Sequence, residues 1–403
     1  MSVIGIVCEY NPFHNGHEYQ IMMGKRILGE DSPVICVMSG DFVQRGEPAV
    51  YSKFARAEAA CLCGADLVLE LPLPWCISSA EGFARGAVGL LAALGATHLC
   101  FGSEAGEVEP LEKLAKVLIK PEINIAVKEI LRSEAGLSYA AARERAVAVE
   151  LGELSEQLKL PNNILAVEYL KSIYEQGLDM IPVTVQRFGS AHDSDSDGPG
   201  PKSASEIRSM IINGDIPEGE IPYKALEVYR RERERGREVS CRANFEIAAL
   251  SRLRMFSEEY FNSLPDAAHG TGTRLYKSCR RECSLDAVLS AAKTKRYALA
   301  RIRRMCLCAC LGIKEGMNKG IPPYARVLAA DEKGCALLKA AAEKSAVPIL
   351  TKPASVRNMS EDCRKLFAAG AAAHDFYSLC YRADCERKGG TDWSTSPKIV
   401  ESN

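Results

Sequence analysis

The sequence predicts an α/β fold in which a parallel sheet is wrapped by helices and is followed by a mainly helical domain. Between residues 3 and 213, short apolar runs of β type alternate with helical segments, which is the pattern of strands joined by crossover helices. Residues 239–381 are mostly helical in pattern, with one short β-like run, AVPILTK. The runs expected to form the sheet are VIGIVCEY, PVICVMSG, DLVLELP, HLCFGS and MIPVTVQRF.

A polar segment marks the expected domain boundary. Residues 214–236 contain two prolines and then YRRERERGRE, a run of mixed charge without a wide apolar face. A chain of 403 residues is long enough for two domains. We therefore expect an α/β domain over residues 1–215, a charged linker over 216–240, a helical domain over 241–385 and a polar tail over 386–403.

Composition narrows the class of protein. Hydrophobic residues make up 47% and charged residues 26%, as in soluble globular proteins. The start of the chain does not look like a signal peptide, no apolar run is long enough to cross a bilayer, and sixteen scattered cysteines are expected to stay reduced. A cytoplasmic protein without a membrane partner is predicted. The formal net charge of -1 gives no general attraction to DNA or RNA, so a nucleic-acid partner would need a local basic patch.

The clearest chemical signal is the loop NPFHNGH, residues 11–17, which lies between a predicted strand and a predicted helix. Free N–H groups and the positive end of the helix dipole attract an anion there. His14 and His17 could donate hydrogen bonds to phosphoryl oxygens, and Gly16 would let a nucleotide approach the backbone. The alternative is that the two histidines only cap an ordinary helix.

This loop is similar to the HxGH signature of the nucleotidyltransferases, which is related to the HIGH motif of class I aminoacyl-tRNA synthetases. IVCEYNPFHNGH, MSGDFVQRGEPA (38–49), PNNILAVEYLK (161–171), SASEIR (203–208) and TKRYALARIRR (294–304) together resemble the bacterial tRNA(Met) cytidine acetate ligases. The resemblance covers nearly the whole chain. It implies a Rossmann-like nucleotidyltransferase domain that adenylates acetate with ATP, accompanied by Mg²⁺. The acetyl group would then pass to N4 of the wobble cytidine of elongator tRNA(Met), forming N4-acetylcytidine.

The resemblance also implies site residues. His14 and His17 would stabilise the α-phosphate, and Ser203, Ser205 and Arg208 would cradle the triphosphate. The expected ATP contacts are Val7, Cys8, Glu9, Tyr10, Asn11, Pro12, Phe13, His14, Asn15, Gly16, His17, Glu18, Tyr19, Gln20, Gly102, Asn162 and Arg187.

Several of these positions have simpler alternatives. Gly102 could be a turn glycine, Asn162 a helix cap and Arg187 a surface ion-pair partner. Ser203 could form a capping box with Glu206.

Another group of polar residues follows the second predicted strand. Asp41, Gln44 and Arg45 would lie at the carboxyl edge of the sheet, where they could hold acetate.

Two basic clusters bear on RNA binding. The preferred tRNA patch is a predicted helical stretch around Tyr297, whose ring could stack on a base; its alternative is a solvated helix face. Its basic residues are Lys293, Lys295, Arg296, Arg301, Arg303 and Arg304. The second cluster, Arg230, Arg231, Arg233, Arg235 and Arg237, is interleaved with glutamates and is interpreted as a linker.

Two other patterns are interpreted as structural. Cys306, Cys308 and Cys310 lie in an apolar helical stretch that suits core packing better than zinc. HGTGTR has the wrong spacing for a phosphate loop, and residues 269–273 depart from the more acidic pattern expected of the family.

Two other functions stay open at this point. The HxGH signature alone equally suits an adenylyl- or cytidylyltransferase acting on a small phosphorylated metabolite. A noncatalytic RNA-binding protein is the third hypothesis.

Overall fold

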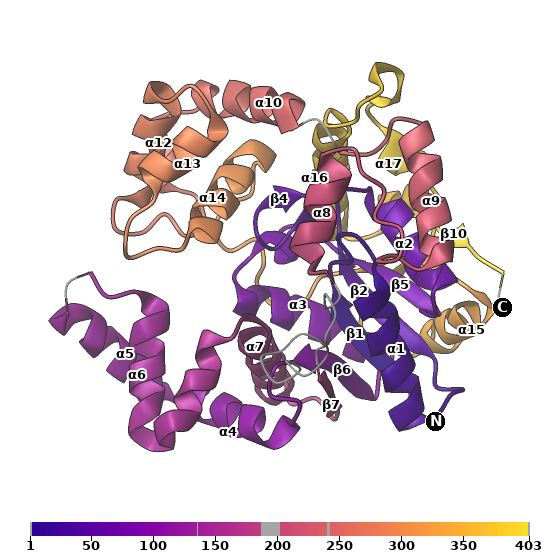
Figure 1. The fold of residues 1–403 in the computed structure, drawn as a ribbon, viewed down its shortest axis with the longest axis horizontal. Coiled ribbons are helices and arrows are strands. Elements are labelled where there is room, and N and C mark those ends of the chain that lie inside the picture. The colour runs from indigo at the N-terminus through magenta and orange to yellow at the C-terminus, as the bar shows by residue number, and fades with distance from the viewer. Residues whose placement is uncertain (1, 135, 187–201, 240–241, 402–403) are drawn as a thin grey trace.

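The computed structural model describes residues 2–134, 136–186, 202–239 and 242–401. Its centre is an eight-stranded sheet with the strand order β10-β8-β5-β2-β1-β6-β7, and β9 pairs with β8 (Figure 1). The strands are β1 (Ile4–Cys8), β2 (Val34–Ser39), β5 (Leu67–Leu71), β6 (His98–Ser103), β7 (Ile181–Gln186), β8 (Ala325–Ala330), β9 (Ile349–Leu350) and β10 (Lys398–Ile399). A separate hairpin joins β3 (Phe42–Val43) and β4 (Glu47–Pro48).

The five predicted strand runs form β1, β2, β5, β6 and β7, and all four pairings between them are parallel. Alternate side chains point to opposite faces of the sheet. Ile35 and Val37 belong to the core on the face covered by α3, whereas Cys36 and Met38 belong to the core on the face covered by α2. Because both faces are covered, nearly every strand position is apolar, as the sequence pattern indicated.

Helices surround this sheet. Those of the first half are α1 (Asn15–Leu28), α2 (Lys53–Leu62), α3 (Ala80–Ala93), α4 (Val108–Leu118), α5 (Pro121–Ser133), α6 (Tyr139–Leu151), α7 (Pro161–Glu175), α8 (Ala204–Ile212) and α9 (Tyr223–Glu234). The C-terminal segment adds α15 (Glu332–Ala341), α16 (Glu361–Ser378) and α17 (Thr391–Ser394). Short 3-10 helices cover Trp75–Ile77, Gly152–Lys159, Pro353–Asn358 and Asp384–Glu386.

A separate group of helices, here called the helical module, lies beside the sheet (Figure 1). It consists of α10 (Arg242–Met255), α11 (Glu258–Asn262), α12 (Thr271–Arg281), α13 (Leu285–Ala292) and α14 (Leu299–Leu311). In Figure 1, α5 and α6 project from the sheet-containing part on the same side as this module. Within the described ranges, none of the helices combines the length and apolar character needed to cross a membrane.

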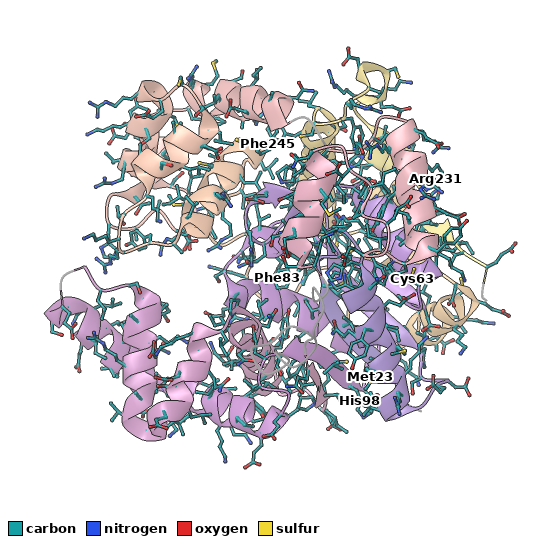
Figure 2. The ribbon with its side chains drawn as sticks, in the orientation of Figure 1. Met23, Cys63, Phe83, His98, Arg231 and Phe245 are labelled. Atoms are coloured by element: carbon teal, nitrogen blue, oxygen red, sulfur yellow. The ribbon has the colours of Figure 1, made fainter. Side chains whose placement is uncertain are left out.

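The segment expected to be a charged linker instead contains α9, which packs against α2. Ala225 and Tyr229 are one turn apart and almost fully buried, so the helix has an apolar face that its dense charges concealed. Arg231, seen on α9 in Figure 2, donates hydrogen bonds of 2.8 and 2.7 Å to the two carboxylate oxygens of Glu58 on α2. The 216–240 linker is therefore corrected to an integral helix of the sheet-containing part.

The expected boundary at residue 385 is also corrected, because the chain returns to the sheet after the helical module. β8 pairs antiparallel with β5, and β10, in the expected polar tail, pairs parallel with β8. Asp392 in that tail is completely buried. A tail that looks polar by composition is thus fixed by a strand at the edge of the sheet and by a buried charge.

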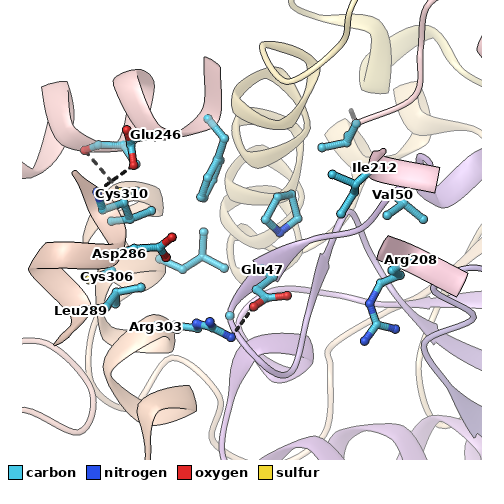
Figure 3. A pocket seen from close by; sticks show the side chains of 17 residues that line it. Glu47, Val50, Arg208, Ile212, Glu246, Asp286, Leu289, Arg303, Cys306 and Cys310 are labelled. Atoms are coloured by element: carbon cyan, nitrogen blue, oxygen red, sulfur yellow. Dashed lines mark hydrogen bonds and ion pairs between the residues drawn. The ribbon is translucent and has the colours of Figure 1, made fainter. Parts of the chain in front are cut away.

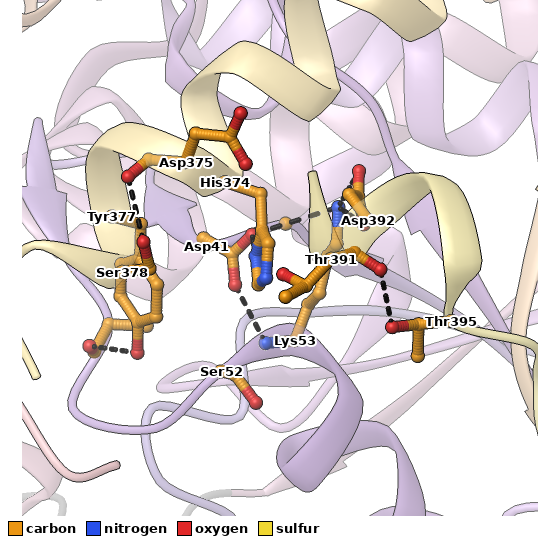
Figure 4. A network of polar contacts seen from close by, with 12 residues as sticks. Asp41, Ser52, Lys53, His374, Asp375, Tyr377, Ser378, Thr391, Asp392 and Thr395 are labelled. Carbon is orange, nitrogen blue, oxygen red and sulfur yellow. Dashed lines mark hydrogen bonds and ion pairs between the residues drawn. The ribbon is translucent and has the colours of Figure 1, made fainter. Parts of the chain in front are cut away.

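Asp392 belongs to a buried ionic network that joins the tail to the sheet. Figure 4 shows the part of this network around Asp41, Lys53, His374 and Asp392. Arg326 on β8 donates to both carboxylate oxygens of Asp392, at 2.8 and 2.9 Å. Lys53, at the start of α2, donates to Glu70 and to Asp392 at 3.0 Å each. Burial opposes ionisation of Asp392, but Lys53 and Arg326 outweigh it and hold the pKa of Asp392 below its ordinary value. The network therefore depends on all of its charges being present.

A histidine and a further aspartate extend this network. His374 Nδ1 on α16 lies 2.8 Å from Asp41 Oδ2, and the same oxygen is 3.7 Å from Lys53 Nζ. Burial lowers the pKa of His374, but the neighbouring Asp41 carboxylate reverses this and leaves the pKa raised. His374 in turn, with Lys53, holds the pKa of Asp41 down against the effect of burial.

The first prediction concerns Asp392. Asp392→Ala should lower the free energy of unfolding by about 3–5 kcal/mol, because it removes the carboxylate that Lys53 and Arg326 share and leaves both cations buried. Urea unfolding would measure this. The matched control is Asp384→Ala, which removes an exposed carboxylate paired with Arg387 and should cost about 1 kcal/mol or less. Similar losses in the two variants would contradict a structural role for the tail.

The second prediction concerns pH. Because the folded-state pKa of His374 is raised, its stabilising contribution is complete below the unfolded-state pKa of about 6.5 and is lost as the pH rises through the folded value. The difference in unfolding free energy between the wild type and His374→Gln should therefore shrink from pH 6 towards alkaline pH. A difference that stays constant would show that folding does not shift the pKa of His374.

Candidate active site

The HxGH loop leaves the carboxyl end of β1 and enters α1, and distant segments hold its backbone. Asn11 Oδ1 accepts a hydrogen bond from Val50 N at 2.9 Å. Phe13 N donates to the hydroxyl of Tyr229 on α9 at 2.9 Å. Asn15 Nδ2 donates to Gly219 O at 2.7 Å. The region expected to be a linker is therefore part of the scaffold of this loop.

His14 and His17 cap α1 reciprocally. His14 Nδ1 accepts from Gly16 N at 3.1 Å, and His17 Nδ1 accepts from His14 N at 3.3 Å. The ring centroids are 3.8 Å apart. Because both Nδ1 atoms accept, the proton of each neutral ring lies on Nε2, so both rings can act as donors beside the helix N-terminus. The capping alternative is thus present in the structure, and it fixes the tautomer of both rings.

Glycine is required at position 16 for a steric reason, in addition to the expected approach of a nucleotide to the backbone. A Cβ atom at this position would lie 3.0 Å from Cε1 of His14. A side chain at residue 16 would therefore push the His14 ring away from its capping position.

Glu9 and Arg56 lie where β1 ends. The guanidinium of Arg56, on α2, is fully buried and donates to the carbonyl oxygens of Glu9, Ser39 and Tyr51. It therefore ties the ends of β1 and β2 together. Burial raises the pKa of the Glu9 carboxyl, although it accepts a 2.7 Å hydrogen bond from Gln44 N and has Arg56 nearby.

The SASEIR segment reaches the loop through its arginine. Arg208 Nη1 on α8 donates to Asn11 O at 2.9 Å. Ser203 caps α8 and forms the capping box with Glu206, whose carboxylate accepts from Ser203 N at 2.7 Å. Ser203 Oγ and Ser205 Oγ are 2.9 Å apart. The cap explains Ser203 locally, whereas Arg208 makes a contact across the fold that a cap does not require.

At the neighbouring strand, an unpredicted glutamate organises the residues expected to bind ATP. Glu104 Oε1 accepts from Asn162 Nδ2 at 2.6 Å, and Glu104 Oε2 accepts from Asn163 N at 2.8 Å at the start of α7. Glu104 therefore caps α7, and Asn162 does not. Gly102 pairs with Val185 inside β6, so it is not a turn glycine. A carboxylate directly after the run HLCFGS was the signal that could have identified Glu104.

Arg187, which was also expected to contact ATP, lies outside the described residues.

The structure corrects the assignment of Asp41 to an acetate pocket. Asp41 is buried, its Oδ1 accepts from Lys53 N at 2.9 Å, and its Oδ2 meets His374. Oδ1 thus binds the backbone at the start of α2, and only Oδ2 belongs to the ionic network. Gln44 Nε2 donates to Ser78 O at 3.2 Å, and Arg45 is exposed. Only Gln44 and Arg45 stay available as expected acetate contacts.

The expected tRNA patch divides into two parts. Lys293, Lys295 and Arg296 precede α14 and have no ion pair with any acidic residue that the structure describes. In α14, Arg303 pairs with Glu47. Arg301 Nη2 donates to the carbonyl of Asp266 at 2.8 Å, and Arg304 lies 3.7 Å from its carboxylate. The guanidinium of Arg301 also lies 4.1 Å from the centre of the Tyr297 ring. The patch charges that no described acidic residue neutralises are therefore those of the two lysines and Arg296.

A groove runs beside this patch. It is lined by all the patch residues except Arg303, together with Ser138 and Tyr139 at the start of α6. The patch thus faces the projecting α5–α6 pair across an open space.

The fold agrees with the interpretation of the three neighbouring cysteines as core residues. Cys306, Cys308 and Cys310 are buried inside α14. Within the described ranges, no cluster of three or more His, Cys, Asp or Glu side chains is arranged to hold a metal ion. HGTGTR follows α11 and begins α12, so it has no strand before it.

Comparison with known proteins places these observations in a family. Residues 1–392 match the family model described as HIGH Nucleotidyl Transferase. A Clostridium kluyveri protein named tRNA(Met) cytidine acetate ligase is 37% identical, with 100% of both chains covered. An Acetivibrio thermocellus protein of the same name is 32% identical, covering 99% of this chain and 100% of that protein.

Solved structures support the same family assignment. Thermotoga maritima TmcAL bound with alpha-thio ATP superposes with a TM-score of 0.91 at 31% identity, and its apo form with 0.93 at 32%; both comparisons cover 100% of each chain. Since the family model spans almost the whole sequence and full-length relatives exceed 30% identity, the chain belongs to the HIGH nucleotidyl transferases and, among them, to the tRNA(Met) cytidine acetate ligase family.

Proposed function

We propose that this chain is an ATP-dependent carbon–nitrogen ligase that acetylates N4 of the wobble cytidine of elongator tRNA(Met) in the cytoplasm. The observation that carries the proposal is the capped His14–His17 pair at the N-terminus of α1, in a chain similar over its full length to proteins named tRNA(Met) cytidine acetate ligase. ATP is the co-substrate, which is supported by the solved relative bound with alpha-thio ATP.

The chemistry proceeds in two steps. A carboxylate oxygen of acetate attacks the α-phosphorus of ATP, pyrophosphate leaves, and acetyl-adenylate forms. The cytosine N4 amine then attacks the acetyl carbonyl carbon, AMP leaves, and one N4 proton is released. Acetate needs this activation because its anion is a poor electrophile. Neither step requires a covalent bond to the enzyme.

Each group of site residues has its own proposed role in this chemistry. Nε2–H groups of His14 and His17 stabilise charge on the α-phosphate, in the positive field of the α1 N-terminus. Ser203, Ser205 and Arg208 hold the remaining phosphates, and Arg187 is proposed to assist them. Gly102 and Asn162 contact the nucleoside, and Glu104 positions Asn162 through its 2.6 Å hydrogen bond.

Mg²⁺ would accompany the triphosphate. Since the described residues offer no preformed cluster of metal ligands, the ion would be held mainly by phosphate oxygens and water, which is a common mode for Mg²⁺. When bound, it would neutralise part of the phosphate charge.

The third prediction tests this function. With ATP and Mg²⁺, radiolabel from acetate should enter unfractionated tRNA, and digestion should yield N4-acetylcytidine. His17→Ala should slow acetate-dependent exchange of pyrophosphate into ATP by about 100-fold or more, because it removes one donor to the developing charge. The control His98→Ala changes a histidine at the start of β6 whose ring bonds Thr97, and it should retain exchange.

Two results would contradict the ligase. ATP consumption that requires a small phosphorylated metabolite, with no label in tRNA, would instead support a metabolite nucleotidyltransferase. A His17→Ala protein that keeps full function would favour a noncatalytic RNA-binding role.

The fourth prediction concerns tRNA binding. The triple variant in which alanine replaces Lys293, Lys295 and Arg296 should show a weaker dependence of log affinity on log salt concentration. The slope of this dependence should fall by about one for each phosphate contact that is lost. Filter binding at several salt concentrations would measure the slope. The charge-matched control replaces Lys113, Lys116 and Lys120 of the α4 region, which pair with glutamates. An equal slope in the patch variant and the wild type would contradict the assignment.

A further inference from the structure

A cavity of about 110 Å³ lies between the helical module and the sheet-containing part (Figure 3). It is comparable with the engineered cavity of about 150 Å³ that binds a benzene ring. Its walls come from α10, α13 and α14 on one side, and from β4, Val50 and α8 on the other. Apolar side chains such as Val50, Ile212, Leu289 and Leu307 form most of them. The cavity therefore suits a flat, mostly apolar ring.

The cavity shares residues with the scaffold of the HxGH loop. Arg208 lines the cavity, and its Nη1 donates to Asn11 O at 2.9 Å. Val50 also lines it, and its backbone N donates to Asn11 Oδ1 at 2.9 Å. Asn11 lies three residues before His14. A ring held in this cavity is thus separated from the nucleotide loop by a single layer of residues.

Besides Arg208, Glu246 and Asp286, the charged residues that line the cavity are Glu47 and Arg303, which form an ion pair. Glu47 on β4 and Arg303 on α14 point towards one another in the middle of the cavity and are bonded together (Figure 3). Each side chain is 30% exposed, so neither is sealed inside the protein. A carboxylate beside a guanidinium offers an acceptor next to two donors. This is the order of groups that guanine presents to cytosine, whose edge carries an N4 donor beside the N3 and O2 acceptors.

Backbone packing fixes the ion pair in place. Gly46 has a φ of 78°, and a Cβ there would lie 2.7 Å from the backbone N of Arg304. The turn before β4 therefore lies directly against α14, which holds Glu47 next to Arg303. A bulkier residue in this turn would separate the two parts of the protein.

An aromatic ring completes the cavity. Phe245 on α10 lies where the helical module meets the sheet-containing part (Figure 2). Its ring centroid is 5.8 Å from that of Phe376 and 6.4 Å from that of Phe42. Enzymes that modify a base commonly hold it outside its stack, against aromatic and apolar side chains, and read its Watson–Crick edge by hydrogen bonds.

We propose that this interdomain cavity binds the unstacked cytosine base that receives the acetyl group, with Glu47 accepting from N4, Arg303 donating to N3 and O2, and Phe245 packing on the ring. The inference rests on the proposed function, because it assigns a place to the acceptor base of that reaction. It gives Arg303 a role in reading the base, which differs from the phosphate contact expected from its charge. Uracil, with an acceptor at position 4 and a donor at N3, mismatches both members of the pair.

The test separates acetyl transfer from adenylation. For Glu47→Gln and for Phe245→Ala, kcat/KM for tRNA acetylation should fall about 10- to 100-fold, which is the discrimination that one base-reading side chain provides. Acetate-dependent exchange of pyrophosphate into ATP, which needs no tRNA, should change by less than about twofold. The matched control is Glu386→Gln, which breaks a 2.7 Å ion pair with Arg237 that also joins two distant segments; it should retain both activities.

A charge swap distinguishes base recognition from simple attachment of the module. The double variant Glu47→Arg/Arg303→Glu restores an ion pair across the same interface but reverses its donors and acceptors. If the pair reads cytosine, the swap keeps the thermal stability of the wild type and stays deficient in transfer. Transfer restored by the swap would overturn the proposal, as would wild-type transfer in Glu47→Gln and Phe245→Ala.

These outcomes are distinct from failure of the proposed function. If the wild type itself shows neither acetate-dependent exchange nor labelled tRNA, the ligase proposal fails, and the cavity proposal fails with it. If the wild type shows both activities and the cavity variants match it, only the cavity proposal fails.

Discussion

The buried ionic network around Lys53 is the constraint on which the rest of the structure depends. It joins the first residue of α2 to β5 through Glu70, to β8 through Arg326 and to the C-terminal segment through Asp392. Buried charges stabilise a fold only when their partners are in place, so this network requires the chain to return to the sheet after the helical module. The C-terminal segment is thereby fixed to the sheet and to the start of α2.

The position of α2 carries this constraint to the active site. One turn after Lys53, Arg56 binds the backbone carbonyls at the ends of β1 and β2. The loop that follows β1 is held further by Val50, Tyr229 and Arg208. His14 and His17 can then cap α1 and present their Nε2 protons. Preorganisation of this kind is what electrostatic stabilisation of a crowded phosphate needs, because donors that already point correctly do not have to reorganise.

The two-part architecture suits a reaction with two steps. The proposed adenylation would require only the carboxyl edge of the sheet, where the HxGH loop, α7 and α8 meet. The proposed transfer would require a macromolecular substrate, for which the basic segment of the helical module is the proposed binding site. The packing of Gly46 against α14 and the Glu47–Arg303 pair fix the module against that edge. The interface is therefore suited to bring the acceptor base next to the activated acetyl group.

Local pattern determined a large part of this protein. Five strands were predicted from apolar runs because both faces of a parallel sheet are buried, and the HxGH loop was predicted from residue types and spacing because its function resides in consecutive residues. The roles of Asp41, Glu104, Tyr229 and Asp392 were decided only by the tertiary structure. Each acts through a partner distant in sequence: His374 for Asp41, Asn162 for Glu104, Phe13 for Tyr229, and Arg326 for Asp392. Periodicity and composition report which face a residue prefers, whereas a hydrogen bond between remote segments exists only once the chain has folded.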